Sequence, residues 1–389
     1  MNFTLNEDQK RIVDSLERFI QNNYEYPKRR QILASELGFS RNHWQFFANM
    51  GLLGLPFAEE FGGLNLDFAY TALVMEWFGR GLIVEPFLSS VMLSGGLIKH
   101  AGTKAQRATC LAPLIEGRLL LAFAHEDSGS RFGKRSQKTR AQPQGNGFVV
   151  NGGKRLVIHG QSADRFVVSA AGAAGEQDSF LFLLDADQAG MQIDSYRTVD
   201  GQPACDLRLH NVTVPRDHVL AEGKAAQAAL KNVLTEATAG LCAEAYGCMQ
   251  VLFDMTLDYV QQRKQFGKTI GSFQVIQHHM VDCYMDLEQA RSMALLASSS
   301  IASESPDRHQ NVAAAKAFIA EAGLRMGHAA IQLHGAMGMT EELAVGGYHK
   351  RLLMIQTLLG DPNYQIDRLI DLENESSLNV KQAAELCLD

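Results

Sequence analysis

Apolar residues recur every three or four positions near the start of the chain, a spacing that predicts helices. The first predicted helix follows a capping segment at 6–8 and carries Ile12, Leu16, Phe19 and Ile20. Further apolar segments at helical spacing cover residues 44–53, 71–82 and 86–102. Charged residues are sparse there, so we expect the helices of a first domain, 1–116, to be buried on more than one side.

The pattern changes between residues 117 and 224, where short runs of Val, Ile, Leu and Phe alternate with Gly, Asn, Asp and Pro. The runs lie at 119–124, 147–152, 154–160, 164–170, 179–185, 190–196 and 205–214. They are typical of strands joined by tight turns and predict a small all-β domain. We predict hairpin turns at Asn146 and at residues 151–153. No G-x-G-x-x-G sequence opens a helix, so a Rossmann nucleotide site has no support.

Helical spacing returns between residue 225 and residue 389. The best predicted helix spans 226–262, and others span about 273–303, 309–334 and 341–359. The predicted fold class is therefore α+β. It has an N-terminal helical domain (1–116), a middle antiparallel β-barrel-like domain (117–224) and a C-terminal four-helix-bundle domain (225–389).

Composition narrows the function classes. With 46% hydrophobic residues and a net charge of −7, the chain is typical of globular proteins and lacks the basic stripe that nucleic-acid binding needs. Its six cysteines contain no C-x-x-C pair, which argues against a zinc site and favours a reducing compartment. No apolar run reaches the roughly 18 residues of a membrane span, and the N-terminus lacks a secretory pattern. We expect a cytoplasmic protein without metal, nucleic-acid or membrane partners.

Two local sequences carry a resemblance to a known family. Residues 263–267 read RKQFG, and residues 332–338 read QLHGAMG. RKQFG alone would also suit an ordinary helix C-terminus with basic residues and a glycine. With the domain order, the two segments resemble the acyl-CoA dehydrogenase family of FAD flavoproteins over nearly the whole chain. EQARSMA and EELAVGGYHKR look most similar to the bacterial branch that includes pimeloyl-CoA dehydrogenase small subunits and steroid side-chain dehydrogenases.

The resemblance implies FAD as cofactor, an acyl-CoA thioester as substrate, and an electron-transfer flavoprotein or similar acceptor as partner. Arg263 would bind the pyrophosphate of the FAD in a neighbouring subunit, since a guanidinium matches phosphate oxygens bidentately. Phe266 would pack on the cofactor. Because that FAD would cross between subunits, a homodimer or homotetramer is implied. The other implied contacts in the helical part are Phe273, Gln274, Gln332, Gly335 and Ala336.

In the β domain, the resemblance places the flavin against Phe123, His125 and Val157. His125 stands at the family's threonine position and could donate a hydrogen bond to the flavin; the alternative is a polar strand-end residue facing solvent. The tryptophan and threonine that usually flank the flavin are Leu156 and Ile158 here. The resemblance therefore implies a ring held mainly by backbone and apolar contacts.

The base that should abstract the α-proton is missing from its implied position. Most members carry a glutamate before a glycine, where this chain has Leu359, and a minority carry it on the long helix at the position of Ala237. Three nearby carboxylates remain candidates: Glu244, Asp361 and Glu236. Each has a structural alternative. Glu236 could be a solvated or salt-bridged helix residue, Glu244 a buried ion-pair partner of an Arg or Lys, and Asp361 a turn or cap.

Several hypotheses stay open. The chain could be an acyl-CoA dehydrogenase with a relocated base, an FAD-holding subunit beside a larger dehydrogenase subunit that supplies the base, or a flavoenzyme of different chemistry. A non-enzymatic acyl-CoA binding module has the least support. We expect substrate contacts at Arg131 and Gly240. Gly240, Ala243 and Gly247 form a nearly bare helix face that makes room for an acyl chain or allows close helix packing.

Overall fold

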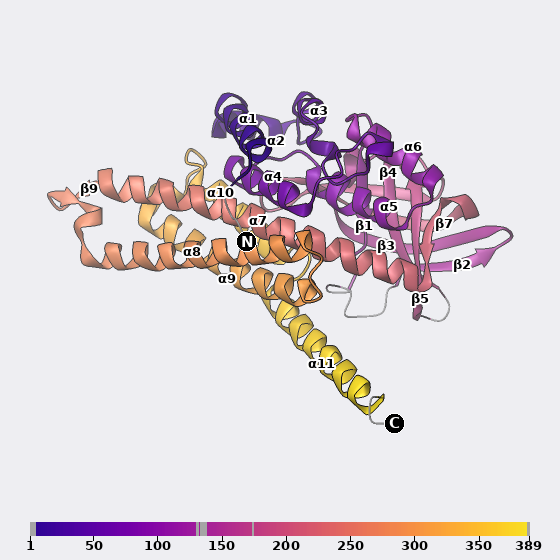
Figure 1. Cartoon of the computed structure of the whole chain (residues 1–389). Coiled ribbons are helices and arrows are strands. Elements are labelled where there is room, and N and C mark those ends of the chain that lie inside the picture. Colours follow the sequence, from indigo (N-terminus) through magenta and orange to yellow (C-terminus); the bar gives the residue numbers. More distant parts are fainter. Residues whose placement is uncertain (1–4, 130–131, 133–137, 173–174, 387–389) are drawn as a thin grey trace. The chain divides into compact units, whose positions relative to one another are not determined.

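The computed structural model describes residues 5–129, 132, 138–172 and 175–386. They form two compact units (Figure 1). The helical unit contains residues 5–27, 68–83 and 238–386, and the mixed unit contains residues 28–67 and 84–237. The long helix α7 (Gly223–Gln262) contributes to both. The N-terminal helices are thus shared between two units and do not form a unit of their own.

The helical unit is built from long amphipathic helices and one short hairpin. Its other elements are α1 (Glu7–Asn23), α4 (Phe68–Gly81), β9 (Lys264–Gln265), β10 (Lys268–Thr269), α8 (Gln274–Ala302), α9 (Arg308–His334), α10 (Val345–Thr357) and α11 (Pro362–Leu386). Asn6 caps α1, and its side chain and that of Gln9 bond each other's backbone N–H. The helices predicted at 226–262, 273–303, 309–334 and 341–359 are confirmed as α7, α8, α9 and α10.

The mixed unit combines short helices with one sheet. Its helices are α2 (Tyr26–Ala34), which begins at the unit boundary, α3 (Arg41–Asn49), a π-helical segment (Phe87–Gly95), α5 (Gly96–Ala101) and α6 (Lys104–Ile115). Its strands are β1 (Leu121–Ala124), β2 (Arg140–Gln144), β3 (Gly147–Ile158), β4 (Arg165–Gly172), β5 (Gly175–Asp185), β6 (Met191–Arg197), β7 (Pro203–Pro215) and β8 (Val219–Glu222).

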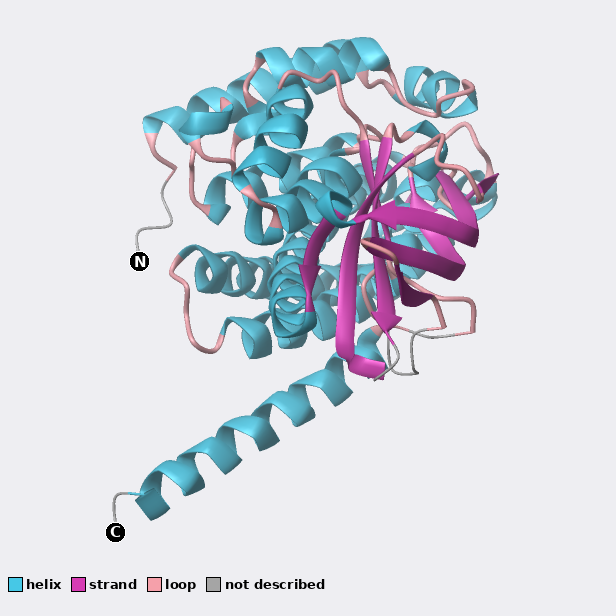
Figure 2. Cartoon of the chain, turned by 90° about the vertical axis from the view of Figure 1, so that its right-hand side faces the viewer, coloured by secondary structure: helices cyan, strands magenta, loops and turns pink. Residues whose placement is uncertain are grey.

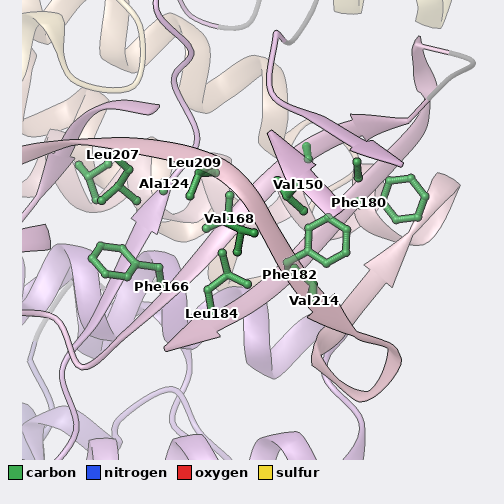
Figure 3. Packing of buried hydrophobic residues seen from close by; sticks show 14 of the residues in the cluster. Ala124, Val150, Phe166, Val168, Phe180, Phe182, Leu184, Leu207, Leu209 and Val214 are labelled. Atoms are coloured by element: carbon green, nitrogen blue, oxygen red, sulfur yellow. The ribbon is translucent and has the colours of Figure 1, made fainter. Parts of the chain in front are cut away.

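All eight of these strands join one sheet, in the order β6-β7-β3-β2-β4-β5-β8, with β1 added beside β4. Figure 2 shows the strands in magenta. Most pairs are antiparallel, as predicted, but β4 pairs in parallel with both β1 and β2. Alternate residues of each strand point into a common apolar core, for example Phe166 and Val168 from β4 and Phe180 and Phe182 from β5 (Figure 3). On the opposite face of β1 and β4, Leu121, Val167 and Ser169 are buried as well.

One predicted turn is wrong. Gly145 and Asn146 form the two-residue loop between β2 and β3, as predicted at Asn146. Residues 151–153 do not turn the chain, because β3 continues through them to Ile158. The register against β7 shifts between Val150 and Gly152, and Gly152 has φ 149°. The glycines therefore serve a β-bulge, which uses the same residue types as a turn but keeps the strand paired.

Close helix packing explains part of the bare face of α7. A side chain at Gly247 would lie 2.0 Å from the carbonyl oxygen of Glu76 on α4, and one at Gly79 would lie 2.0 Å from that of Glu244. Backbones can approach this closely only where glycine faces the neighbouring helix. At Gly247 the packing alternative is therefore the observed one.

Two expectations from composition can be compared with the described residues. Within 5–129, 138–172 and 175–386, no helix is long and apolar enough to cross a membrane. Cys110, Cys205, Cys242, Cys248 and Cys283 are free and buried, and Cys387 lies outside the described residues.

Candidate active site

The hairpin between α7 and α8 exposes a strained aromatic residue. Lys268 pairs with Gln265, which leaves Phe266 and Gly267 as the two loop residues, with φ of 54° and 80°. A loop with two positive φ angles favours Asn-Gly, and a bulky residue there costs about 1–2 kcal/mol. The Phe266 side chain is also 92% exposed. Backbone strain of this kind occurs mostly at functional sites, which makes Phe266 a candidate ligand contact.

Arg263 is held by its backbone and leaves its side chain available. Its N–H donates to the Tyr259 carbonyl and its own carbonyl accepts from Ile270, both at 2.8 Å. The guanidinium is exposed and makes no hydrogen bond or ion pair with any described residue. Gln274, the first residue of α8, is exposed in the same way.

Phe273 connects the hairpin with α8. Its ring meets that of Phe266 edge-on at 6.2 Å, and the Lys268 ammonium lies 4.2 Å from its centroid. A cavity of about 380 Å³ opens between the end of α7 and the start of α8. Leu257, Val260, Ile276 and Met280 supply much of its apolar lining. Its size falls within the roughly 300–1,000 Å³ of small-molecule sites.

The segment 332–338 lies at the same end of the helical unit. Leu333 packs with Val260 of α7 and Met280 of α8, and His334 stacks on Tyr259 with ring centroids 4.3 Å apart. Tyr259 is one helical turn before Arg263, so the structure brings the two family segments together. At the turn, Gly335 has φ 59° and ψ −140°, a conformation that is essentially restricted to glycine.

A side chain at Gly335 would meet no other atom within 4 Å. Gln332, Gly335 and Ala336 are all exposed. The turn therefore offers backbone to an outside ligand and is not closed by neighbouring side chains. This is the arrangement that a phosphate group could approach.

A separate group of candidate residues lies in the mixed unit, at the end of β1. Ala122 and Ala124 point into the sheet core, so Phe123 and His125 share the opposite face. Their rings stack with centroids 5.2 Å apart and an interplanar angle of 13°. His125 Nδ1 lies 2.9 Å from Ser169 Oγ on β4. Val157, by contrast, points into the sheet core, so only its backbone could reach a ligand.

Behind His125 is a buried ion pair that sequence reasoning missed. Lys154 Nζ lies 2.7 Å from Asp127 Oδ1, and both side chains are at most 1% exposed. Burial alone would raise the pKa of Asp127, but Lys154 and hydrogen bonds from Thr139 lower it overall. Burial lowers the pKa of Lys154, and Asp127 opposes this effect. The partners are 27 residues apart and follow no spacing that a sequence pattern reveals.

Each candidate base has a structural partner. Arg351 on α10 donates from Nε and Nη2 to the two oxygens of Glu244, at 2.6 and 2.9 Å. Asp361 accepts from the N–H of Tyr364 at 2.9 Å and thereby caps α11. Glu236, in the mixed unit, lies 3.1 Å from His100 Nε2. The ion pair of Glu244, the cap at Asp361 and the partner of Glu236 correspond to the structural alternatives given above for these residues.

Leu359 lies on a tightly held turn between α10 and α11. Leu359 and Gly360 have φ of 56° and 110°. The buried ammonium of Lys316 on α9 donates to the carbonyls of Ile355 and Gly360 at 2.8 and 2.9 Å. Burial lowers the pKa of Lys316 to about 8, against smaller opposing effects of Cys242 and Asp361. Lys316 is a further residue that the sequence did not reveal.

The expected substrate contacts at Gly240 and Arg131 both stay predictions. Gly240 is buried on α7, at the start of the part that belongs to the helical unit. Arg131 lies outside the described residues, so that expectation stays a prediction. Among the described residues, no group of His, Cys, Asp and Glu could hold a metal ion.

Comparison with known proteins decides the family. The chain matches the acyl-CoA dehydrogenase N-terminal domain over residues 6–118, the middle domain over 121–212 and the C-terminal domain over 226–371. The chain belongs to the acyl-CoA dehydrogenase family. It is thus a relative of flavoprotein oxidoreductases.

Individual acyl-CoA dehydrogenases are similar along most of the chain. "Probable acyl-CoA dehydrogenase YngJ" of Bacillus subtilis (strain 168) is 27% identical over 95% of this chain and 98% of its own length. Mitochondrial isovaleryl-CoA dehydrogenase of Oryza sativa subsp. japonica is 31% identical over 78% of this chain and 76% of its own. Among solved structures, a variant of the Tcur3481-Tcur3483 steroid ACAD is 27% identical, with a TM-score of 0.87 over 96% of this chain and 100% of that one.

Proposed function

We propose that this chain is an FAD-dependent acyl-CoA dehydrogenase that removes hydrogen from the α and β carbons of an acyl-CoA thioester. The observation that carries the proposal is the cluster at one end of the helical unit. An exposed guanidinium at Arg263, a strained exposed ring at Phe266 and an open glycine turn at Gly335 have no evident structural purpose together. They suit a ligand with phosphate groups and a flat ring system.

These residues fit the cofactor that the family uses. Arg263 would bind phosphate oxygens, Phe266 and Phe273 would pack on a ring, and the backbone at Gly335 and Ala336 would approach the pyrophosphate. In the mixed unit, Phe123 and His125 would meet the flavin ring. Bound FAD would supply the acceptor for the hydride that leaves the β carbon. An electron-transfer flavoprotein or a similar acceptor would then reoxidise it.

The contacts of the three candidate carboxylates favour one of them as the catalytic base. A carboxylate can serve as general base only if it lies near the substrate and is able to accept a proton. Glu244 is committed to a bidentate pair with Arg351, and Glu236 lies beside His100. Asp361 is two residues from Leu359 and half-buried, so it is our first candidate despite its role as a cap.

A second function is favoured because each of the three carboxylates already has a partner within the chain. The chain would be the FAD-holding subunit of a hetero-oligomer, and a larger dehydrogenase subunit would supply the base. The similar Tcur3481-Tcur3483 steroid ACAD carries two component names, which supports this alternative.

One experiment separates the two proposals. The purified chain is loaded with FAD and mixed anaerobically with acyl-CoAs of short, branched and steroid type, and loss of flavin absorbance is followed. Bleaching by the chain alone, greatly slowed in Asp361→Asn but not in Glu236→Gln, supports the first proposal. Bleaching only after a co-purified larger subunit is added supports the second. Failure to take up FAD would contradict both.

A further inference from the structure

The polar groups behind His125 determine where its proton lies. We infer that Lys154 and Ser169 are positioning residues that hold His125 in the neutral Nε2–H tautomer, so that it offers one hydrogen-bond donor and no acceptor. The tautomer itself does not depend on the proposed function, and only the identity of the group that accepts from His125 rests on it.

The argument begins with the three protons of the Lys154 ammonium, which can donate but not accept. Three acceptors surround it: Asp127 Oδ1 at 2.7 Å, the His125 carbonyl at 2.8 Å and Ser169 Oγ at 3.3 Å. Each acceptor takes one proton. Ser169 Oγ therefore receives a hydrogen bond from Lys154, and its own hydroxyl proton must point elsewhere.

His125 Nδ1 is the remaining partner of the Ser169 hydroxyl, at 2.9 Å. If Nδ1 carried the imidazole proton, it would donate to Ser169 Oγ and leave the hydroxyl proton unpaired. Ser169 is only 1% exposed, and an unpaired buried donor is strongly unfavourable. Nδ1 therefore accepts, and a neutral imidazole then carries its proton on Nε2.

Charge around the ring keeps His125 neutral. Burial and the Lys154 ammonium lower the pKa of His125 to about 4, and Asp127 opposes them less strongly. Burial raises the pKa of the adjacent Glu126 carboxyl. Its negative charge, which would favour an imidazolium at His125, is therefore less strongly maintained. Stacking on Phe123 fixes the plane of the ring.

Two consequences follow for the site. With Nδ1 occupied and a pKa lowered to about 4, His125 does not take up a proton near neutral pH and is not the missing base. Its Nε2–H is a permanent donor, and no described residue accepts from it. It suits an electron-rich acceptor such as a ring nitrogen or carbonyl oxygen of a flavin.

The test is a two-bond ¹H–¹⁵N correlation spectrum of the full chain without FAD, labelled with ¹⁵N-histidine. His125 is assigned among the twelve histidines by comparison with His125→Gln. We expect the neutral Nε2–H pattern throughout about pH 5 to about pH 8, where ordinary histidines titrate. An Nδ1–H pattern, or titration of His125 in that interval, would overturn the inference.

Matched variants test the positioning role. Ser169→Ala removes the donor to Nδ1 and should lower the ratio of Nε2–H to Nδ1–H by roughly tenfold, the effect of one net hydrogen bond. Ser169→Thr keeps the hydroxyl and should retain the parent pattern. An unchanged pattern in Ser169→Ala would remove Ser169 from the argument. Lys154→Met with Asp127→Asn tests Lys154 without leaving a buried charge, and should also mix the tautomers.

FAD is then added to the same samples. A shift of the His125 Nε2 proton resonance on binding supports donation to the cofactor. No FAD uptake by the parent would contradict the proposed function, while the spectrum without FAD still decides the tautomer.

Discussion

At the scale of single residues, charged side chains of this protein have very different environments. Arg263 is charged, exposed and unpaired among the described residues, whereas Glu244 is charged, buried and paired twice. The first is available to a ligand, and the second stabilises the helical unit. Residue type alone could not separate these roles.

Arg263→Ala should weaken FAD binding by at least tenfold, because a bidentate charge-assisted contact to phosphate is lost. Titration of the FAD-free protein, followed by flavin fluorescence, measures the affinity. Lys264→Ala is the control, since it removes an exposed charge from the next residue. Equal affinity in parent and Arg263→Ala would show that Arg263 does not bind the cofactor.

Glu244→Gln should lower the free energy of unfolding by about 3–5 kcal/mol, because it removes the counter-charge that Glu244 supplies to the buried Arg351 guanidinium. Urea unfolding measures the change. Asp361→Asn keeps a side-chain oxygen that can cap α11 and should cost about 1 kcal/mol or less. If Glu244→Gln were as stable as the parent but could not reduce flavin, Glu244 would be the base after all.

At the scale of elements, two strained turns bear on the candidate site. The hairpin after α7 holds Phe266 at φ 54°, and the turn after α10 holds Leu359 at φ 56°. Both turns lie beside segments that the family resemblance assigns to the cofactor or the base. Each is stabilised differently, the first by strand pairing and the second by Lys316.

Phe266→Asn should stabilise the hairpin and weaken FAD binding at the same time. Asn tolerates the left-handed conformation, so a gain of up to about 1 kcal/mol is expected in thermal unfolding. Loss of the ring should lower FAD affinity. Phe273→Leu, at an ordinary backbone position, should lower affinity without the gain in stability. A destabilised Phe266→Asn protein would argue against strain at this turn.

The Lys316 ammonium should make stability depend on pH above neutrality. Its pKa is about 8 in the folded chain and near 10.5 otherwise, so the unfolded chain binds more protons between these values. The free energy of unfolding should therefore rise with pH in that interval, by about 3 kcal/mol from this group. Lys316→Met removes the effect, and urea unfolding at several pH values gives the difference. A parent and variant with parallel pH profiles would contradict it.

At the scale of the whole molecule, the site needs more than one chain if the family arrangement holds. Apolar side chains on α8 are exposed at helical spacing, with Val281, Tyr284 and Met285 about half exposed. Such a face is typical of an association surface. The implied contact of Arg263 with the FAD of another subunit points in the same direction.

The FAD-loaded protein should therefore have a mass of two or four times 42.8 kDa. Light scattering after gel filtration measures it, with absorbance giving the flavin per chain. Association with a larger subunit would give a mass that is no multiple of the chain. A monomer with one FAD per chain would contradict the proposed intersubunit site.

Neighbours along the chain carry enough information to predict several features of this protein. Helical spacing predicted α7, α8, α9 and α10, and the β-rich middle part was confirmed as one sheet. The segments RKQFG and QLHGAMG indicated the family, because local backbone and cofactor chemistry restrict the residues used there. The same local information misread residues 151–153, since glycines suit a bulge as well as a turn.

Which charged groups meet, by contrast, depends on the tertiary fold. Glu244 and Arg351 are 107 residues apart, and His125 and Ser169 are 44 apart. Contacts at such separations depend on how helices and strands pack, and no periodicity along the chain encodes them. The pairing of Glu244, the cap at Asp361 and the contact between His125 and Ser169 therefore became visible only in the fold. The physical reason for these pairings is burial, because a buried charge or donor without a partner is strongly unfavourable.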